Sequence, residues 1–300
     1  MKNLISIGDL TKKELYDIIE LAVSVKRERS QGIFSNGLKH KTIGMIFEKP
    51  STRTRTAFEV AMVELGGYPI YLNWNDLQLG RGETTADTAR VLSRYLSCLV
   101  VRANSHSTII DLAKNASVPV INALSNVEHP CQLLADLMTI YEKRGRLSGL
   151  KLAWIGDGNN VCNSAILSCA LMDMNIDVAC PLGYEPNDAI LRRGQELSSV
   201  RVLRDPLEAA TAADVLYTDA WVSMGDEATA AVRARAFAKY RIDNAVLDAA
   251  NSDAIVLHCL PAHRGQEITD EVMDGPHSVV FDQAENRLHA HKALLLKLLC

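Results

Sequence analysis

Residues 43–67 read IGMIFEKPSTRTRTAFEVAMVELGG and contain an apolar run, a polar turn and a helical pattern in succession. The apolar run at residues 43–47 is typical of a buried strand, and the helical pattern covers residues 53–65 and ends at Gly66-Gly67. Three hydroxyl side chains and two arginines lie at residues 51–55, where the turn passes into the helix. Backbone N–H groups, hydroxyls and guanidinium groups therefore meet at one helix N-terminus, an arrangement suited to a phosphate or carboxylate.

The alternation of strand and helix continues on both sides of this stretch. Thr11 and Glu14 have the spacing of a capping box, and they open a helix whose apolar face is formed by Leu15, Ile18, Ile19, Ala22 and Val25. Further strands are predicted at residues 68–72, 98–101, 120–121, 150–155, 176–180, 200–203, 215–218 and 255–260. Further helices are predicted at residues 109–116, 130–141, 160–172, 188–197 and 286–299. Strands that alternate with helices predict an α/β fold with two parallel sheets.

The composition narrows the classes of function. The 300 residues suggest two domains, and a hydrophobic fraction of 48% is enough for a sizeable core. A net charge of −4 and a pI near 6.1 provide no basic field for nucleic acid, so an anionic ligand has to be bound by local clusters. The seven cysteines form no CxxC pair, which argues against a disulfide framework or structural zinc. No apolar run has the length of a membrane span, and the first residues do not resemble a signal peptide or presequence, so we expect a cytoplasmic protein.

Polar groups that can bind an anion follow the predicted strands, and ligands of parallel α/β sheets bind beyond the carboxyl ends of the strands. The two hydroxyl–arginine pairs at residues 51–55 predict an anion site. The alternative is a capped helix with surface arginines, since Arg55 has the i, i+4 spacing for a salt bridge with Glu59. Arg102 follows the strand at residues 98–101 and is expected at the same sheet edge as Ser51; the alternative is a solvated arginine at a strand end.

Three further polar side chains lie at helix starts. His129 precedes Pro130, which suits the first position of a helix, and Gln132 follows within one turn. Imidazole and amide N–H groups can stabilise a carbonyl oxygen whose negative charge grows during nucleophilic attack; the alternative is that His129 only caps the helix. Arg287, at the start of the last helix, either points to the same ligand or lies on the helix surface.

Residues 156–160 read GDGNN, which is similar to the start of a dinucleotide-binding fingerprint. The third glycine is replaced by Val161. The acidic residue expected about twenty positions later would be Asp177, which lies inside the next strand instead of ending it. These differences disfavour nicotinamide binding, although an oxidoreductase remains an alternative. The asparagines of this segment are instead suited to the carboxylate or amine of a zwitterion.

Two more segments follow strands of the second half. Asp219 precedes the turn Ser223-Met224-Gly225, a pattern that suits recognition of a cationic amine or is an ordinary acidic loop. His258 and Cys259 lie near the end of the strand at residues 255–260. Cys259 has two possible chemical roles, as a nucleophile or in a metal site with His263. A buried cysteine is more often inert, and this His/Cys spacing is unusual for zinc.

The segments Ser51-Thr52-Arg53-Thr54-Arg55, His129-Pro130-Cys131-Gln132 and His258-Cys259-Leu260-Pro261 together resemble the aspartate/ornithine transcarbamylase family. Asp219 with Ser223-Met224-Gly225 is similar to the ornithine-specific branch of that family. The resemblance implies direct attack of the δ-amine of L-ornithine on carbamoyl phosphate through a tetrahedral intermediate, which gives L-citrulline and phosphate. It implies no metal and no organic cofactor. A transcarbamylase that acts on another amine or amino acid, and a non-catalytic protein that kept the fold, are the remaining alternatives.

The resemblance also implies roles for individual residues. The residues expected to bind carbamoyl phosphate are Ser51, Thr52, Arg53, Thr54, Gln78, Arg102, His129, Gln132, Cys259, Leu260 and Arg287. The residues expected to bind ornithine are Leu124, through its carbonyl, Asn160, Asp219, Ser223 and Met224. Catalysis is expected from Arg53, Arg102, His129, Gln132, Asp219 and Cys259. In this scheme Cys259 orients the amine and is not a nucleophile.

By the same resemblance, the fold is expected to consist of two doubly wound parallel-sheet α/β domains. Residues 1–134 and 286–300 would form the carbamoyl-phosphate domain, on which the C-terminal helix packs, and residues 135–285 the ornithine domain. Residues 143–149 are the candidate linker. Family members are trimers or assemblies of trimers, so a homotrimer is expected, with Gln78 serving the site of a neighbouring subunit. The bulky Trp74 in the loop before Gln78 departs from the family pattern.

Overall fold

The computed structural model of the chain describes residues 1–222 and 227–300. The chain divides into two compact units: unit 1 comprises Met1–Met138 and Glu285–Cys300, and unit 2 comprises Thr139–Ala284. The chain passes from one unit to the other inside helix α5 (Pro130–Arg144) and again inside helix α12 (Val280–Leu299). The candidate linker at residues 143–149 lies within unit 2.

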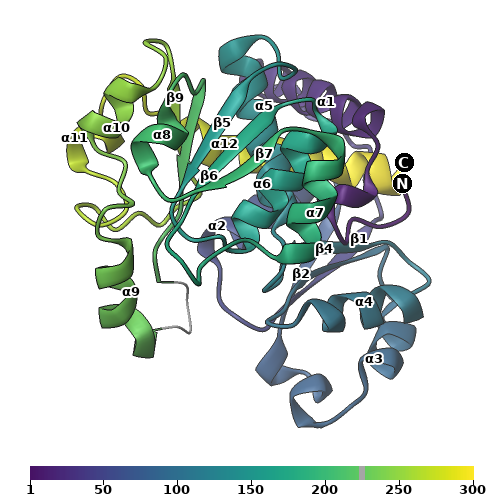
Figure 1. The fold of residues 1–300 in the computed structure, drawn as a ribbon. Helices are drawn as coiled ribbons and strands as arrows, with labels where there is room; N and C mark the ends of the chain where they lie inside the picture. Colours follow the sequence, from purple (N-terminus) through teal and green to yellow (C-terminus); the bar gives the residue numbers. More distant parts are fainter. Residues whose placement is uncertain (223–226) are drawn as a thin grey trace. The chain divides into compact units, whose positions relative to one another are not determined.

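Unit 1 is built on a four-stranded parallel sheet with strand order β2-β1-β3-β4 (Figure 1). Its strands are β1 (Thr42–Phe47), β2 (Tyr68–Asn73), β3 (Cys98–Arg102) and β4 (Val120–Leu124). Its helices are α1 (Lys12–Ser30), α2 (Thr52–Glu64), α3 (Thr85–Leu92), α4 (His106–Asn115), the first part of α5 and the larger part of α12, with short 3-10 helices at Ile7–Asp9, Trp74–Asp76 and Gln78–Arg81. The strand order changes direction between β1 and β3, and ligands of such sheets bind at this switch point.

Both faces of this sheet are buried. Ile46 and Leu99 pack with Ala89 of α3 and Ile109 of α4 in one apolar cluster. Because successive side chains of a strand point to opposite faces, Met45 points away from this cluster, and it is also fully buried. Burial on both faces explains why the strands read as continuous apolar runs in the sequence.

The first and last helices of unit 1 match their predicted roles. Thr11 Oγ1 accepts a hydrogen bond from the Glu14 N–H at 3.2 Å, and the Glu14 carboxylate accepts one from the Thr11 N–H at 2.9 Å. The five apolar residues predicted for α1 are all buried. His291 of α12 stacks on Phe58 of α2 with ring centroids 3.9 Å apart. The predicted packing of the C-terminal helix on the first half of the chain is confirmed.

Unit 2 contains a five-stranded parallel sheet with strand order β7-β6-β5-β8-β9 (Figure 1). Its strands are β5 (Lys151–Ile155), β6 (Asn175–Ala179), β7 (Val200–Leu203), β8 (Val215–Thr218) and β9 (Ile255–His258). Its helices are α6 (Asn160–Leu171), α7 (Asp188–Leu197), α8 (Pro206–Ala210), α9 (Ala230–Phe237), α10 (Asn244–Ala249) and α11 (Asp270–Met273), with a 3-10 helix at Glu227–Thr229. The switch point of this sheet lies between β5 and β8.

Helices also pack on the sheet of unit 2. On one face, Ile155, Leu216 and Val256 of the strands pack with Phe237 of α9 and Val272 of α11. Helix α6 contacts β6, and its residues 161–170 are all buried. A helix that is buried on every side lacks the alternation of polar and apolar faces, which matches the apolar sequence of this segment.

The predicted fold class, two parallel-sheet α/β domains, is confirmed. Several element boundaries differ from the prediction, and two of these differences have a clear cause. Helix α12 begins at Val280 and not at residue 286. Its first turn is held inside unit 2 by Gln283, whose Oε1 accepts from the His258 N–H at 2.9 Å and whose Nε2 donates to the Tyr217 hydroxyl at 3.1 Å. Strand β9 ends at His258, because Leu260 has a left-handed φ of 59° and its N–H bonds to the His258 ring instead of a neighbouring strand.

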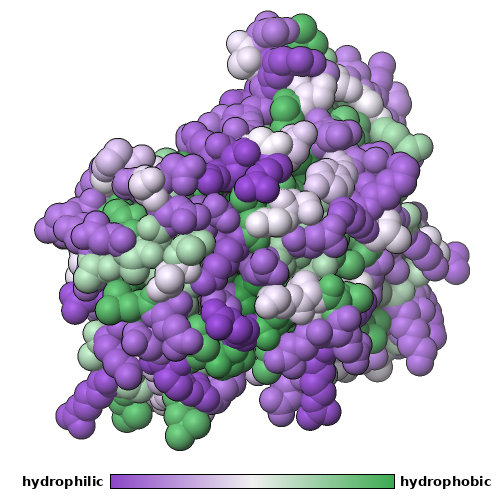
Figure 2. Space-filling model, turned by 45° about the horizontal axis from the view of Figure 1, so that its top comes forward, coloured by the Kyte–Doolittle hydropathy of each residue, from purple (hydrophilic) through white to green (hydrophobic). Residues whose placement is uncertain are grey.

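The surface is predominantly polar on the face seen in Figure 2, where apolar residues form small patches among hydrophilic ones. This mixture is normal for folded proteins. None of the helices formed by residues 1–222 and 227–300 has both the length and the apolar character that a membrane span requires.

Candidate active site

The anion-binding residues predicted in unit 1 lie at one edge of its sheet. Phe47 of β1 and Leu124 of β4 both pair with Arg102 of β3, so the three parallel strands end together. Arg102 is the last residue of β3, and the segments that follow β1 and β4 carry Ser51 and His129. This edge includes the switch point between β1 and β3, where ligands of such sheets bind.

The N-terminus of α2 has the predicted cap. Ser51 is the N-cap residue, and its Oγ accepts a hydrogen bond from the Thr54 N–H at 3.4 Å. The N–H groups of Thr52 and Arg53 belong to the first turn, where a helix offers them no acceptor. Thr52 and Arg53 are exposed, and Thr54 is buried. This helix end therefore presents donors and a positive dipole end to an anion.

The second arginine of the segment has a structural role. The Arg55 Nε donates to Glu59 Oε1 at 2.9 Å, and its guanidinium lies 3.8 Å from the centre of the Tyr71 ring. The structural alternative for Arg55 is thus confirmed, and Arg53 is the arginine of this turn that has the ligand role in our scheme.

Arg102 is a buried cation. Its side chain is 5% exposed, and its Nε has no hydrogen-bond partner among the described residues. Burial, and then the like charges of Arg287 and Arg53, lower the pKa of Arg102 to about 10. A dianion placed here would relieve the repulsion and supply the missing acceptor. The burial of Arg102 contradicts the alternative of a solvated strand end.

Arg287 joins three segments of unit 1. Its Nη2 donates to Thr54 Oγ1 at 3.0 Å, its Nη1 donates to Gln132 Oε1, and its Nε donates to His291 Nε2 at 3.4 Å. The side chain is buried. The alternative that Arg287 lies on the helix surface was wrong, because its donors are engaged with buried groups of α2 and α5.

His129 and Gln132 have the chemistry expected of neutral donors. Burial, and then the charges of Arg287 and Arg102, hold the pKa of His129 well below its ordinary value. A neutral imidazole has one N–H to donate. The Gln132 Nε2 donates to Asp136 Oδ1 at 2.8 Å, while its Oε1 accepts from Arg287. These partners fix the orientation of the amide, whose second N–H can serve a ligand.

We call this set the unit 1 cluster: Ser51, Thr52, Arg53, Thr54, Arg102, His129, Gln132 and Arg287. Two other predicted residues of unit 1 have no hydrogen bond to it among the described residues. Gln78 is exposed on its 3-10 helix. The Leu124 carbonyl accepts from the Ala103 N–H at 3.1 Å, so it already has one partner.

In unit 2, the predicted amine-binding residues follow neighbouring strands. Thr218 of β8 pairs with His258 of β9, so Asp219 and Cys259 leave the sheet next to one another. Asn159 follows β5, on the other side of the switch point between β5 and β8. The strand order therefore brings these three side chains to the position where a ligand is expected.

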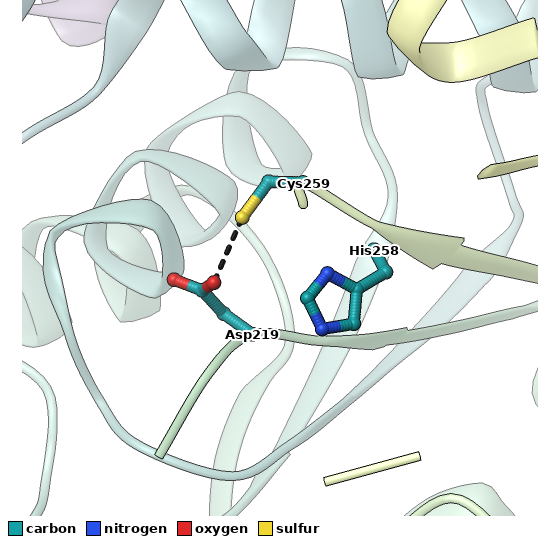
Figure 3. A group of neighbouring side chains, drawn as sticks. All are labelled: Asp219, His258 and Cys259. Atoms are coloured by element: carbon teal, nitrogen blue, oxygen red, sulfur yellow. Dashed lines mark hydrogen bonds between the residues drawn. The ribbon is translucent and has the colours of Figure 1, made fainter. Parts of the chain in front are cut away.

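The Asp219 carboxylate is held through both oxygens. Its Oδ1 accepts from the Cys259 Sγ at 2.9 Å (Figure 3) and from the Ala220 N–H at 2.8 Å. Its Oδ2 accepts from the Asn159 Nδ2 at 2.7 Å. A thiol that donates a proton to a carboxylate is not in the nucleophilic thiolate form. This geometry favours an orienting role for Cys259 over a nucleophilic one.

Asn159 belongs to the GDGNN segment whose asparagines suit a zwitterion, but it is not among the residues predicted to bind ornithine. It is the N-cap of α6, and its Oδ1 accepts from the N–H groups of Val161 at 2.9 Å and Cys162 at 3.1 Å. The amide nitrogen is thereby directed to Asp219. An asparagine before an apolar helix is a recognisable N-cap signal. Asn160, the predicted residue, is the first residue of the helix itself.

His258 uses both ring nitrogens. The Leu260 N–H donates to Nδ1 at 2.9 Å, so the proton is on Nε2, which donates to the buried Glu267 Oε1 at 3.1 Å. Ligand atoms of Asp219, His258 and Cys259 lie within 4.8 Å of one another (Figure 3). Since His258 has no lone pair left for a cation, this group does not fit a metal site.

Backbone conformation and packing explain the two glycines of the GDGNN segment: Gly156 has a φ of 138°, and Gly158 has no room for a side chain. A Cβ on Gly158 would lie 2.3 Å from the backbone nitrogen of Pro186, so the loop before α7 occupies the space beside it. Asp177 pairs with Arg201 Nη2 at 2.6 Å and with Lys151 Nζ at 2.8 Å. The space beside Gly158 is therefore filled, and the Asp177 carboxylate is already paired, so neither can bind a dinucleotide. This disfavours the oxidoreductase alternative. The predicted ornithine-binding residues Ser223 and Met224, with Gly225, lie outside the described residues.

Two family models match the two halves of the chain. The aspartate/ornithine carbamoyltransferase carbamoyl-P binding domain matches residues 2–142, and the Asp/Orn binding domain of the same family matches residues 148–298. An ornithine carbamoyltransferase of Archaeoglobus fulgidus is 56% identical over 300 residues, which cover 100% of this chain and 98% of that protein. The corresponding protein of Methanosarcina acetivorans is 55% identical over 299 residues, 99% of each chain.

Solved structures agree with these matches. The ornithine carbamoyltransferase from Pyrococcus furiosus superimposes with a TM-score of 0.96 at 48% identity, covering 99% of this chain and 97% of that one. The enzyme from Thermus thermophilus superimposes with a TM-score of 0.92 at 43% identity, covering 100% of this chain and 99% of that one. The chain belongs to the aspartate/ornithine carbamoyltransferase family.

Proposed function

We propose that this protein is an ornithine carbamoyltransferase, which transfers the carbamoyl group of carbamoyl phosphate to the δ-amine of L-ornithine and releases phosphate. The observation that carries the proposal is the buried Nε of Arg102, which has no partner among residues 1–222 and 227–300 and lies beside Arg287 and the N-terminus of α2, an arrangement that suits a small dianion. Relatives more than 50% identical over the whole chain and named for this activity support it. In this scheme residues 1–134 and 286–300 form the carbamoyl-phosphate domain and residues 135–285 the ornithine domain.

The unit 1 cluster binds carbamoyl phosphate. Ser51, Thr52, Arg53 and Thr54 hold the phosphate, which suits the donors of a helix N-terminus. Arg102, His129 and Gln132 donate to the carbamoyl oxygen, whose negative charge grows as the carbonyl carbon becomes tetrahedral. Arg287 binds the same ligand from α12. Neutral His129 is the appropriate form, because an imidazole held neutral donates without adding a third buried positive charge.

The residues of unit 2 bind ornithine and its δ-amine. A free alkyl amine has a pKa of roughly 10, so ornithine arrives as an ammonium and has to lose a proton before it attacks. Asp219, fixed by Asn159 and Cys259, attracts the ammonium and orients the neutral amine. The nitrogen then forms its bond to the carbonyl carbon, and the bond to the phosphate oxygen breaks. The first proton leaves the ammonium to solvent before the attack, and the departing phosphate accepts the second proton, which the nitrogen releases once it is bonded to the carbonyl carbon. No group of the enzyme forms a covalent bond in this sequence.

A colorimetric citrulline assay with carbamoyl phosphate and ornithine tests this function. We expect citrulline from ornithine and no carbamoylated product from aspartate, acetylornithine or putrescine. Product from one of those amines and none from ornithine would assign the chain to a sister activity. No product from any amine, with folded protein, would reject a catalytic function.

Removal of metal ions is expected to leave the rate of citrulline formation unchanged. Both nitrogens of His258 are occupied by hydrogen bonds, and the Asp219 carboxylate is bound to Cys259 and Asn159. In the proposed reaction these groups bind and orient the amine directly, and no step uses a metal ion. The measurement is the steady-state rate before and after dialysis against EDTA. A loss of activity that zinc restores would contradict this account of the site.

We also propose that the protein acts in the cytoplasm as a homotrimer or an assembly of trimers, with Gln78 completing the site of a neighbouring subunit. Gln78 is exposed in unit 1, which suits a contact with another chain. Scattering measurements of mass in solution test the assembly itself. A monomer with full activity would reject the role of the neighbouring subunit.

Mixing two inactive variants tests the shared site. Gln78→Ala and Arg102→Met subunits, dissociated and reassembled in equal amounts, are expected to recover about a quarter of wild-type activity, since random closed rings contain that fraction of intact sites. Each variant reassembled alone is the control and is expected to stay inactive. Recovery no greater than the sum of the two controls would show that Gln78 acts within its own subunit or not at all.

A further inference from the structure

His291 is a buried histidine to which the proposed reaction gives no role. It lies on α12 four positions after Arg287, on the same side of the helix. Its side chain is 0% exposed. The imidazole stacks on the Phe58 ring of α2, with centroids 3.9 Å apart and planes inclined by 11°. All three residues belong to unit 1.

The contact with Arg287 requires the neutral form of this imidazole. His291 Nε2 accepts from Arg287 Nε at 3.4 Å, so that nitrogen cannot carry a proton. Burial, and then the charge of Arg287, hold the pKa of His291 well below its ordinary value. The acceptor is therefore present at neutral pH.

The other nitrogen of the ring shows that the position is not optimised for stability. His291 Nδ1 has no hydrogen-bond partner among the described residues. A buried polar atom without a partner destabilises the fold, and an apolar side chain of similar size would not carry this cost. The contact with Arg287 Nε is what an apolar side chain cannot provide.

A guanidinium is planar, and its donors keep fixed directions relative to one another. Fixing Nε therefore fixes the plane in which the two Nη groups lie. In this structure those groups donate to Thr54 Oγ1 and to Gln132 Oε1, two members of the unit 1 cluster. The stacked ring of His291 is held by Phe58, so it provides a rigid support for that plane.

We propose that His291 is a positioning residue for carbamoyl-phosphate binding, which orients the Arg287 guanidinium through its Nε. This inference rests on the proposed function of the unit 1 cluster. Its consequence is specific: loss of the acceptor weakens the binding of phosphate-containing ligands and leaves ornithine binding and the folding of the chain intact.

The test uses His291→Leu and His291→Gln in the full-length protein. Leucine keeps the volume and removes the acceptor, and we expect a roughly five- to tenfold rise in the KM for carbamoyl phosphate, as for the loss of one hydrogen bond of ordinary strength. The dissociation constant of inorganic phosphate, measured by calorimetry, is expected to rise by the same factor. The KM for ornithine stays within about twofold of wild type. Glutamine offers an amide oxygen to Arg287 Nε and is expected to restore phosphate binding.

His289→Leu is the matched control. His289 is also buried on α12, and its Nδ1 also lacks a partner among the described residues, but its Nε2 contacts Glu285 at 3.3 Å and not Arg287. The same chemical change at this position is expected to leave phosphate affinity within about twofold of wild type. The melting temperature of His291→Leu is expected to stay near that of wild type, because removal of the unpaired Nδ1 offsets the loss of the acceptor for Arg287 Nε.

Three results would overturn the inference. They are wild-type phosphate affinity in His291→Leu, an equal loss in His289→Leu, and a loss in His291→Leu that accompanies a lower melting temperature and is not restored by glutamine. The phosphate titration needs no turnover, so it separates the inference from the proposed function. A wild-type chain that binds phosphate and forms no citrulline would reject the function alone, and one that binds no phosphate would reject both.

Discussion

Replacing Arg102 by methionine is expected to lower kcat/KM for carbamoyl phosphate by roughly 10³-fold, at the upper end of what a single charge-stabilising donor contributes. Methionine has a similar length and no charge, so it removes the donor without opening a large cavity. The side chain is buried beside Arg287 and Arg53, and its Nε lacks a protein partner among the described residues. Steady-state kinetics with saturating ornithine measure the change.

The same variant is expected to be more stable than wild type when no ligand is bound. Burial and like charges lower the pKa of Arg102 to about 10, well below its ordinary value, so keeping the guanidinium charged in the folded chain costs stability at every pH below about 10. One pKa unit corresponds to about 1.4 kcal/mol, so the cost is on the order of 3 kcal/mol. Thermal unfolding should show a higher melting temperature for Arg102→Met and a smaller increase when phosphate is added.

Arg55→Met is the control for this prediction. Arg55 is an exposed arginine of the same turn, paired with Glu59 and stacked on Tyr71. An exposed ion pair contributes about 0–1 kcal/mol to stability, so Arg55→Met should fold normally. Because Arg55 has no ligand role in the proposed scheme, kcat/KM for carbamoyl phosphate should stay within a few-fold of wild type. An Arg102→Met enzyme with wild-type kinetics would remove Arg102 from the site.

Replacing Asp219 by asparagine is expected to lower kcat/KM for ornithine by about 10²-fold or more, since loss of one member of a desolvated charge pair costs about 2–5 kcal/mol. Asparagine keeps the shape and removes the charge that attracts the ammonium. It also replaces an oxygen that accepts from Asn159 or Cys259 by a nitrogen that cannot accept. The KM for carbamoyl phosphate is expected to change little, because Asp219 has no contact with that ligand in the proposed scheme.

Asp177→Asn provides the same chemical change elsewhere in unit 2. Asp177 is buried and pairs with Arg201 and Lys151, so its replacement is expected to lower the melting temperature and leave the KM for ornithine near wild type. If both variants lose stability and neither changes ornithine saturation, Asp219 is a structural residue and the assignment of the amine site is wrong.

Elements with a strong local signal were predictable from the sequence. The capping box and apolar face of α1, the Pro130 start of α5 and the buried strand before Ser51 each depend on residues within one or two turns of one another. The helices α8 to α11 were not predicted. They are short, and their formation depends on packing with the strands in the core of unit 2. The early start of α12 likewise depends on contacts of Gln283 with β8 and β9.

The sequence predicted which residues form the site better than it predicted the hydrogen bonds between them. Strand ends and helix starts pointed to Arg102, His129, Gln132 and Asp219. No local pattern could show that Asn159 bonds to Asp219, 60 positions away, or that Arg287 bonds to Gln132, 155 positions away. The neutral state of His129 also depends on burial beside distant arginines, which a sequence does not reveal.

A crystal structure of the protein with carbamoyl phosphate and norvaline, an ornithine analogue without the δ-amine, tests the central claim most directly. The account predicts phosphate oxygens within hydrogen-bond distance of the N–H groups at residues 52–53 and of the Arg53 guanidinium. It also predicts the carbamoyl oxygen beside Arg102, His129 and Gln132. A phosphate bound elsewhere, with Arg102 and Arg287 making no contact with it, would contradict the account.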